Sequence, residues 1–382
     1  MGYKEEYQRW LDIFSGDPET VKELQSIAGD EKEIEDRFYT ELAFGTAGLR
    51  GVLGMGTNRM NVYNIRRATM GVAKYLIAQN VQDQGVVIAY DSRIMSDVFA
   101  KETALTLAAA GVKAYLFDAL RPVPLLSYAV RHLNCAAGVV ITASHNPPQY
   151  NGYKLYGEDG AQIGPEIADA VTAVIRSTSY LDCSLMDEDE AKAKGLLHII
   201  GNAEVDDDYI ARVRTLAVQP EMLAQEGGTL KIVYTPLHGS GNVPVRRILK
   251  EIGITNVSVV REQELPDPNF TTLKVPNPED PTAFTLGIQL ADEVGADMIF
   301  ATDPDCDRLG CAVRDKNGEF RLLTGNQIGC VMLYYILSAR KKQGRLPENG
   351  AVVKSIVSTS LANRICADFG VDIFETLTGF KY

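Results

Sequence analysis

The chain has 382 residues, 46% of them hydrophobic, and its 50 acidic residues against 38 lysines and arginines give a net charge of −12. A chain of this length is expected to bury sizeable cores in two or three domains. Its acidity, with no basic tract, excludes a binder of nucleic acid or of anionic membranes. We therefore expect a small-molecule ligand, with no nucleic-acid, membrane or obligate protein partner.

The cysteines and the absence of targeting signals indicate a cellular compartment. The six cysteines lack paired spacing, and the sequence contains neither a signal peptide nor a long apolar run. This pattern is typical of reduced thiols in a cytoplasmic protein. Cys306 lies among acidic residues that would raise its pKa, which favours a packing role over a catalytic one.

Residues 1–43 are rich in charge and show helical periodicity, for example over 17–28. We expect them to form an N-terminal helical cap.

The first α/β pattern begins after this cap. An apolar strand is predicted over 86–90, a helix over 99–110, a second strand over 113–117 and another helix over 124–133. The alternation predicts an α/β domain, to which we assign residues 44–203.

A serine turn is predicted at the end of the next strand. Residues 136–141 form a short β-branched run that is typical of a strand buried on both faces, and residues 142–148 read Thr-Ala-Ser-His-Asn-Pro-Pro. The prolines force a turn that would expose Ser144, with His145 beside it and Lys154 a few residues later. A nucleophile, a base and a cation would then lie together, although the local pattern fits an ordinary turn equally well.

The alternation restarts after a polar connector near residues 201–208. Apolar strands are predicted over 231–234 and 297–301, and a third restart falls near Gly325. We assign residues 204–322 to a second domain and residues 323–382 to a partial third domain.

Three carboxylates follow the strand at 297–301. In the segment Thr-Asp-Pro-Asp-Cys-Asp-Arg, Asp303, Asp305 and Asp307 occupy alternate positions, and their side chains would point the same way in an extended chain. An all-oxygen set of this kind suits Mg²⁺. Zinc would require clustered His or Cys ligands, and an EF-hand would require Gly and Glu where Arg308 and Arg314 stand.

The serine and aspartate segments together resemble the α-D-phosphohexomutase superfamily, specifically its phosphoglucomutase and phosphopentomutase branch. Three further segments agree in order and spacing, namely residues 44–51, 234–241 and 377–381. The match extends from about residue 40 to the last residue. The resemblance implies successive related α/β domains, with the third domain incomplete and the fourth absent.

The resemblance also implies an activity. Ser144 would carry a phosphoryl group and exchange it with a sugar phosphate, interconverting glucose 1-phosphate and glucose 6-phosphate through glucose 1,6-bisphosphate. As a phosphoserine, Ser144 would join the three aspartates as a ligand of Mg²⁺. The residues implied for catalysis are Ser144, His145, Lys154, Arg308 and Arg50, and those implied for substrate binding are Gly379 and Lys381.

Several alternatives remain open at this point. Either His145 or Lys154 could be the general base, whereas His238 is expected to be a hydrogen-bonded turn residue. The substrate could be a pentose or mannose phosphate. A truncated sugar-phosphate binder with little activity is a second reading, and a magnesium phosphatase with Asp303 as its nucleophile is a third. The sequence does not determine the oligomeric state.

Overall fold

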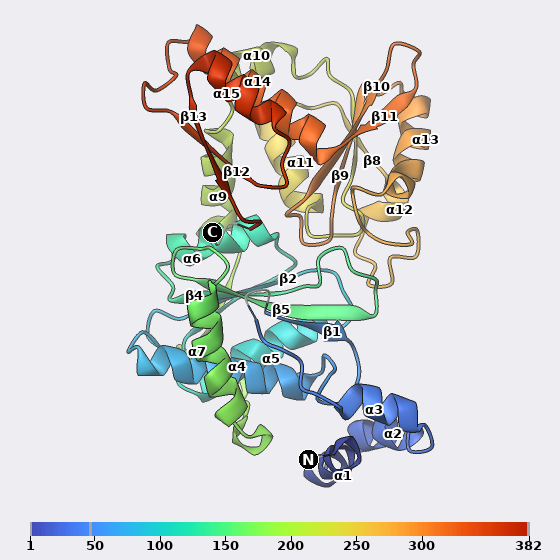
Figure 1. Cartoon of the computed structure of the whole chain (residues 1–382), viewed down its shortest axis with the longest axis vertical. Helices are drawn as coiled ribbons and strands as arrows, with labels where there is room; N and C mark the ends of the chain where they lie inside the picture. Colours follow the sequence, from blue (N-terminus) through green and yellow to red (C-terminus); the bar gives the residue numbers. More distant parts are fainter. Residues whose placement is uncertain (1, 46–47, 380–382) are drawn as a thin grey trace. The chain divides into compact units, whose positions relative to one another are not determined.

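The computed structural model describes residues 2–45 and 48–379. The chain divides into two compact units, each visible in Figure 1: Met1–Val205 with Asp267–Asn269, and Asp206–Pro266 with Phe270–Tyr382. All six cysteines are unpaired thiols, as expected. Among the helices of the described ranges, none combines the length and the apolar character needed to cross a membrane.

The predicted N-terminal helical region is confirmed. Asp17 and Asp30 act as N-caps, because their carboxylates accept hydrogen bonds from backbone amides in the first turn of the following helix. The apolar faces of the helices pack around Trp10, which is wholly buried. The helices are α1 Tyr3–Ile13, α2 Pro18–Ser26 and α3 Glu31–Phe38.

The first unit is built on a six-stranded sheet with the order β1-β5-β4-β2-β3-β6. Strands β4, β2, β3 and β6 are parallel, whereas β5 runs antiparallel to both β4 and β1. The strands are β1 Leu49–Val52, β2 Val86–Tyr90, β3 Ala114–Phe117, β4 Ala137–Ile141, β5 Tyr150–Gly157 and β6 Leu197–Ile200. All five residues of β4 are buried, as the continuous apolar run predicted.

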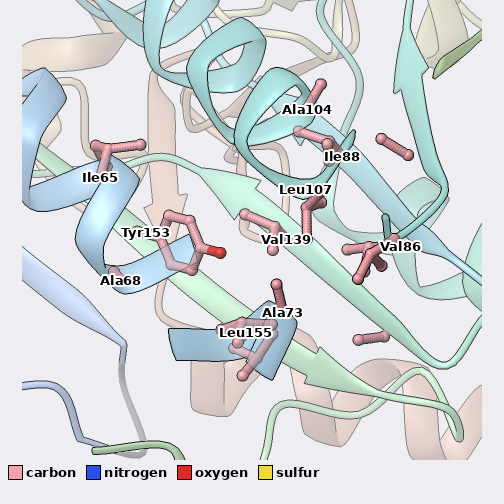
Figure 2. Packing of buried hydrophobic residues seen from close by; sticks show 14 of the residues in the cluster. Ile65, Ala68, Ala73, Val86, Ile88, Ala104, Leu107, Val139, Tyr153 and Leu155 are labelled. Atoms are coloured by element: carbon pink, nitrogen blue, oxygen red, sulfur yellow. The ribbon is translucent and has the colours of Figure 1, made fainter. Parts of the chain in front are cut away.

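Helices cover both faces of this sheet. Figure 1 shows α4, α5 and α7 on one face and α6 on the other. In the close view of Figure 2, Ile65 of α4 and Leu107 of α5 lie around Val139 of β4 and Tyr153 of β5, and all four are buried. The helices of this unit are α4 Val62–Ala78, α5 Ser96–Ala109, α6 Val123–His132, α7 Pro165–Ser177 and α8 Glu188–Ala193, with short 3₁₀ turns at Tyr180–Asp182 and Asn202–Glu204.

The second unit contains a five-stranded sheet with the order β11-β10-β9-β7-β8. Its strands are β7 Ile232–Thr235, β8 Val257–Val259, β9 Met298–Thr302, β10 Leu309–Arg314 and β11 Phe320–Leu323. Strands β8, β7 and β9 are parallel, and β10 and β11 continue the sheet antiparallel. The helices around this sheet are α9 Asp206–Arg214, α10 Pro220–Glu226, α11 Asn242–Glu251, α12 Arg261–Glu264 and α13 Thr285–Val294, with a 3₁₀ turn at Pro281–Phe284.

Side chains alternate between the two faces of this sheet. Val233 and Ile299 belong to the same apolar cluster as Ala291 of α13, whereas Ile232 belongs to the cluster of Leu249 on α11. The period of two therefore sends neighbouring residues of β7 into two separate cores.

The last part of the second unit forms a parallel pair of strands with two helices. These elements are α14 Gly325–Lys342, β12 Ala351–Ser355, α15 Leu361–Phe369 and β13 Asp372–Thr376. The helix α14 starts where the sequence indicated a third restart. The predicted fold of successive α/β domains is confirmed, and the domain boundaries assigned from the sequence remain predictions.

We predict that Phe38→Ala lowers the free energy of unfolding of the N-terminal helices by about 3 to 5 kcal/mol, because it leaves a cavity in a packed core. The Phe38 ring lies edge-on to Trp10 at a centroid distance of 5.7 Å. Trp10 is the single tryptophan of the chain, so its fluorescence during urea unfolding measures this change. The matched control is Tyr39→Ala, because Tyr39 is 63% exposed. A loss below about 1 kcal/mol for Phe38→Ala would contradict the role of this cluster.

Candidate functional site

Ser144 lies just beyond the carboxyl end of β4, the edge of a parallel sheet where α/β proteins bind ligands. Its φ of 52° is in the left-handed region, which non-glycine residues seldom adopt. The Ser144 hydroxyl lies 3.2 Å from Nδ1 of His145, within hydrogen-bonding distance. The structure therefore brings the predicted nucleophile and one of the two predicted bases into contact.

The expected exposure of Ser144 is wrong in one respect. The residue is only 4% exposed, although the turn itself forms as predicted. The Ser144 amide donates to the hydroxyl of Thr142, which in turn donates to Asp91. The start of the turn, at Thr142 and Ser144, is thus buried and hydrogen-bonded to Asp91 at the end of the neighbouring strand.

Two residues that hold the serine turn through hydrogen bonds, Asp91 and Arg93, were not predicted from the sequence. Asp91 is the first residue after β2, the parallel neighbour of β4, and Arg93 donates to backbone carbonyls of the serine turn. Both residues are buried, at 1% and 3% exposure. A polar Asp-Ser-Arg segment after a fully apolar strand was the available signal, because parallel strands bring their carboxyl ends to one edge.

Arg50 lies on β1 and donates from Nη1 to Oδ1 of Asn146 in the serine turn, at 3.3 Å. Gly48, two residues earlier, approaches β5 closely: a Cβ on Gly48 would lie 1.9 Å from the carbonyl oxygen of Tyr153. Gly48 also has a φ of 74°, so no other residue fits there without strain. The structure places Arg50 beside the serine turn.

Lys154 lies on β5, where it pairs with Val140 of β4. It is buried, with 7% exposure. The structure thus places this candidate lysine in the strand next to the serine strand.

The three aspartates gather in the second unit, just beyond the carboxyl end of β9. One carboxylate oxygen from each of Asp303, Asp305 and Asp307 lies within 4.8 Å of the others. Asp303 and Asp305 are wholly buried, whereas Asp307 is exposed. Three carboxylates at this separation repel one another, and a divalent cation relieves that repulsion.

The prediction that this cluster forms from alternate positions of an extended chain is wrong. The segment is not extended: the Cys306 amide donates to the Asp303 carbonyl at 2.9 Å, and Cys306 has a φ of 53°. A tight turn therefore brings the carboxylates together, not the alternation of side chains along a strand. The Arg308 amide donates to Oδ1 of Asp303 and closes the turn.

The loop after β7 packs against this acidic turn. The amide and hydroxyl of Ser240 both donate to the Pro304 carbonyl, at 2.8 and 2.9 Å. A Cβ on Gly241 would lie 2.6 Å from the Tyr234 hydroxyl and 2.7 Å from Oγ1 of Thr302. Burial and the charge of Asp303 raise the pKa of Cys306 to about 12, which agrees with a packing role.

The remaining candidates differ in how far the structure describes them. The Arg308 side chain is partly exposed, with its guanidinium 3.8 Å from the carboxylate of Glu279. Both ring nitrogens of His238 lie within hydrogen-bonding distance, of the Leu265 carbonyl and the Thr272 hydroxyl, so the expectation of a bonded turn residue is confirmed. Gly379 follows β13 with a φ of 114°, and Lys381 lies outside the described residues.

Comparison with known proteins identifies the family. The fold and the two loops define an α/β protein of the phosphohexomutase type. Sequence models of three consecutive phosphoglucomutase/phosphomannomutase alpha/beta/alpha domains match the chain, domain I over residues 41–182, domain II over 207–318 and domain III over 324–382. The chain therefore belongs to the phosphoglucomutase/phosphomannomutase family of the α-D-phosphohexomutase superfamily.

Individual relatives support this assignment. The phosphoglucomutase of Staphylococcus haemolyticus is 39% identical over 349 residues, which cover 91% of this chain and 62% of that protein. The phosphoglucomutase of Staphylococcus epidermidis is 38% identical over 374 residues, covering 98% of this chain and 66% of that protein. The chain thus spans less than two thirds of the length of these two relatives.

Solved structures show the same fold. A putative phosphomannomutase from Thermus thermophilus superposes with a TM-score of 0.72 at 26% identity, covering 90% of this chain and 70% of that one. The predicted resemblance to the superfamily is confirmed.

We predict that Gly241→Ala destabilises the second unit by about 1 to 3 kcal/mol, because the new methyl group overpacks the base of the acidic turn. Tyr234 is wholly buried and the Thr302 side chain is short, so neither can move aside easily. Thermal unfolding measures the loss. The control is Gly228→Ala, whose Cβ would meet nothing nearer than 3.6 Å. Equal stability of the two variants would contradict the close packing of this turn.

Proposed function

We propose that the chain is a phosphosugar mutase that interconverts glucose 1-phosphate and glucose 6-phosphate through a phosphoserine at Ser144. The observation that carries this proposal is the contact between the Ser144 hydroxyl and Nδ1 of His145, at 3.2 Å, on an anchored turn. The phosphoglucomutase relatives favour a glucose phosphate over a mannose or pentose phosphate as the substrate. Glucose 1,6-bisphosphate would be the intermediate and activator.

The residues of the first unit can perform the nucleophilic step. Ser144 Oγ attacks phosphorus while the bond between phosphorus and the sugar oxygen breaks. The serine proton passes through Nδ1 of His145, the nearer of the two candidate bases in the sequence, to the departing sugar oxygen. Arg50 and Lys154 supply positive charge for the phosphoryl oxygens, because a loose transition state for phosphoryl transfer requires mainly charge neutralisation and alignment. In the reverse step His145 returns the proton to Ser144 as the phosphoryl group leaves.

The acidic turn fits a magnesium ion. Asp303, Asp305 and Asp307 offer hard oxygen ligands from a single turn, and this set leaves coordination positions for water and phosphate oxygens. We propose that a phosphoryl oxygen on Ser144 is one of these further ligands. A bound Mg²⁺ would supply Lewis-acid neutralisation of the transferring group. Arg308 holds Asp303 through its backbone amide and adds a guanidinium at the same turn.

The rest of the proposal concerns the residues that bind the sugar and the cellular compartment of the protein. We propose that Gly379 and Lys381 belong to the loop that binds the sugar. The ligand is a small sugar phosphate, and the unpaired thiols favour a cytoplasmic setting.

We predict that the chain takes up one phosphate at Ser144 when incubated with glucose 1,6-bisphosphate and Mg²⁺, and that Ser144→Ala abolishes both this uptake and mutase turnover. Intact-mass measurement and an assay of glucose 1-phosphate conversion test the prediction. The matched control is Ser177→Ala, because Ser177 is an exposed serine at the end of α7. Retention of the mass shift by Ser144→Ala would refute the assignment.

The same measurement separates the alternatives. A phosphate trapped on Asp303 would indicate a phosphatase with an aspartyl nucleophile. Binding of sugar phosphates without phosphate transfer would indicate a sugar-phosphate binder. Faster turnover of mannose 1-phosphate or of a pentose phosphate than of glucose 1-phosphate would change the substrate.

We predict that Asp303→Asn, Asp305→Asn and Asp307→Asn each weaken Mg²⁺ binding and lower turnover at least about a hundredfold, because the metal accounts for several kcal/mol of transition-state stabilisation. Titration calorimetry with Mg²⁺ or Mn²⁺ measures binding independently of turnover. The control is Asp368→Asn on α15, which removes an exposed carboxylate elsewhere. Full activity in excess EDTA would be incompatible with a metal-dependent step.

A further inference from the structure

Arg93 donates four hydrogen bonds to one short loop. Its Nη2 donates to the carbonyls of Ser144, at 2.5 Å, and of Asn146. Its Nη1 donates to the carbonyls of Pro147 and Tyr150, at 2.9 and 3.1 Å. One buried guanidinium therefore binds four backbone carbonyls within residues 144–150.

The composition of the loop explains why such a residue is required. Pro147 and Pro148 have no amide hydrogen, so this segment has fewer backbone donors for its own carbonyls, although the Tyr150 amide donates to the Pro147 carbonyl. Buried carbonyls without donors are costly, so a donor from outside the loop stabilises it. An arginine carries five N–H groups in a planar fork, and no other side chain offers as many.

Asp91 holds this guanidinium in place. Its Oδ2 lies 3.3 Å from Nε of Arg93, and its Oδ1 accepts from the Arg93 amide and the Ser96 hydroxyl. The carboxylate also accepts from Thr142, whose hydroxyl receives the Ser144 amide. The Asp91–Arg93 pair thus binds Ser144 at both its amide and its carbonyl, directly or through Thr142.

We propose that Arg93 is a positioning residue for phosphoryl transfer at Ser144. It holds the left-handed backbone of Ser144 in the single orientation that directs the hydroxyl toward His145 and toward a bound sugar bisphosphate. The inference rests on the proposed function and adds a residue that acts on the reaction only through the loop. Misplacement of a reacting group by about 1 Å can cost about a hundredfold in rate.

The affected step is the loading of Ser144 from a hexose bisphosphate. A bond forms between Ser144 Oγ and phosphorus, and the bond between phosphorus and the sugar oxygen breaks. The serine proton leaves through the neighbouring base and ends on the sugar oxygen, which departs as a hydroxyl. Arg93 touches neither the phosphoryl group nor the sugar in this step.

The test is Arg93→Lys, which preserves the positive charge beside Asp91 but can no longer bind four carbonyls. We expect the rate constant for phosphate uptake at saturating glucose 1,6-bisphosphate to fall about 10- to 100-fold. The bisphosphate concentration that gives half the maximal rate should change less than about threefold, because no binding group is lost. Rapid quenching followed by intact-mass measurement gives both quantities.

The matched control is Arg67→Lys in the same unit. Arg67 is also buried, is paired with Glu41, and donates to the carbonyls of Thr178 and Arg176 away from the serine loop. We expect Arg67→Lys to lower thermal stability and to leave the uptake rate unchanged. Hydrogen exchange should increase in residues 142–151 for Arg93→Lys and not for Arg67→Lys.

A second variant tests the same inference if Arg93→Lys does not fold. Thr142→Val keeps the shape of a wholly buried side chain and removes the hydroxyl that connects Asp91 to the Ser144 amide. It should slow phosphate uptake at least about fivefold, again without a large change in half-saturation.

The outcomes separate this inference from the proposed function. Normal uptake by wild type, Arg93→Lys and Thr142→Val would overturn the positioning role and leave the proposed function intact. A fall in rate of the same size in Arg67→Lys would also overturn it, because the effect would then be general destabilisation. Absence of phosphate on wild-type Ser144 would overturn the proposed function, and the inference with it.

Discussion

The buried ion pair between Asp91 and Arg93 is the interaction on which the serine loop depends. A loop with two consecutive prolines has fewer amides for its own carbonyls, and the Arg93 guanidinium donates to four of these carbonyls. The adjacent carboxylate and the multiple hydrogen bonds offset the free-energy cost of burying the Arg93 guanidinium. Removing one partner of such a buried pair typically costs about 3 to 5 kcal/mol, because the other charge is left unpaired. The strand order places the pair correctly, because β2 and β4 are parallel neighbours that end at the same edge.

The acidic turn of the second unit is held by different means. Its carboxylates gather in a tight turn, and the contacts that hold this turn include the Arg308 amide, the Ser240 hydroxyl and the space left by Gly241. The two loops are therefore held differently. The serine loop is bound by the guanidinium of Arg93, whereas the acidic turn is shaped by backbone hydrogen bonds that bring three carboxylates within 4.8 Å of one another.

Much of the fold was predictable because its strands are short, apolar and rich in β-branched residues. The predicted strand at 86–90 is β2, and the run at 136–141 contains β4, since a strand buried on both faces must be apolar throughout. Helix boundaries were less accurate: α5 begins at Ser96, not at Phe99. The capping of α5 does not follow the usual side-chain pattern, because Met95 at its N-cap has a left-handed backbone and makes no side-chain cap bond.

The sequence by itself determined the α/β fold, the family and the chemical identity of the candidate groups, because Ser144 and the Asp303–Asp307 segment are contiguous motifs directly after apolar strands. Only the tertiary structure decided how those groups are held. Arg93 lies 51 positions before Ser144, whose carbonyl it binds. A pattern in neighbouring residues cannot predict a contact between positions so far apart in the sequence. The acidic cluster likewise owes its form to the left-handed turn at Cys306 and the packing of the loop after β7. Local patterns report which face of an element is buried, whereas hydrogen-bond partners that are remote in sequence are chosen by the order of strands in the sheet.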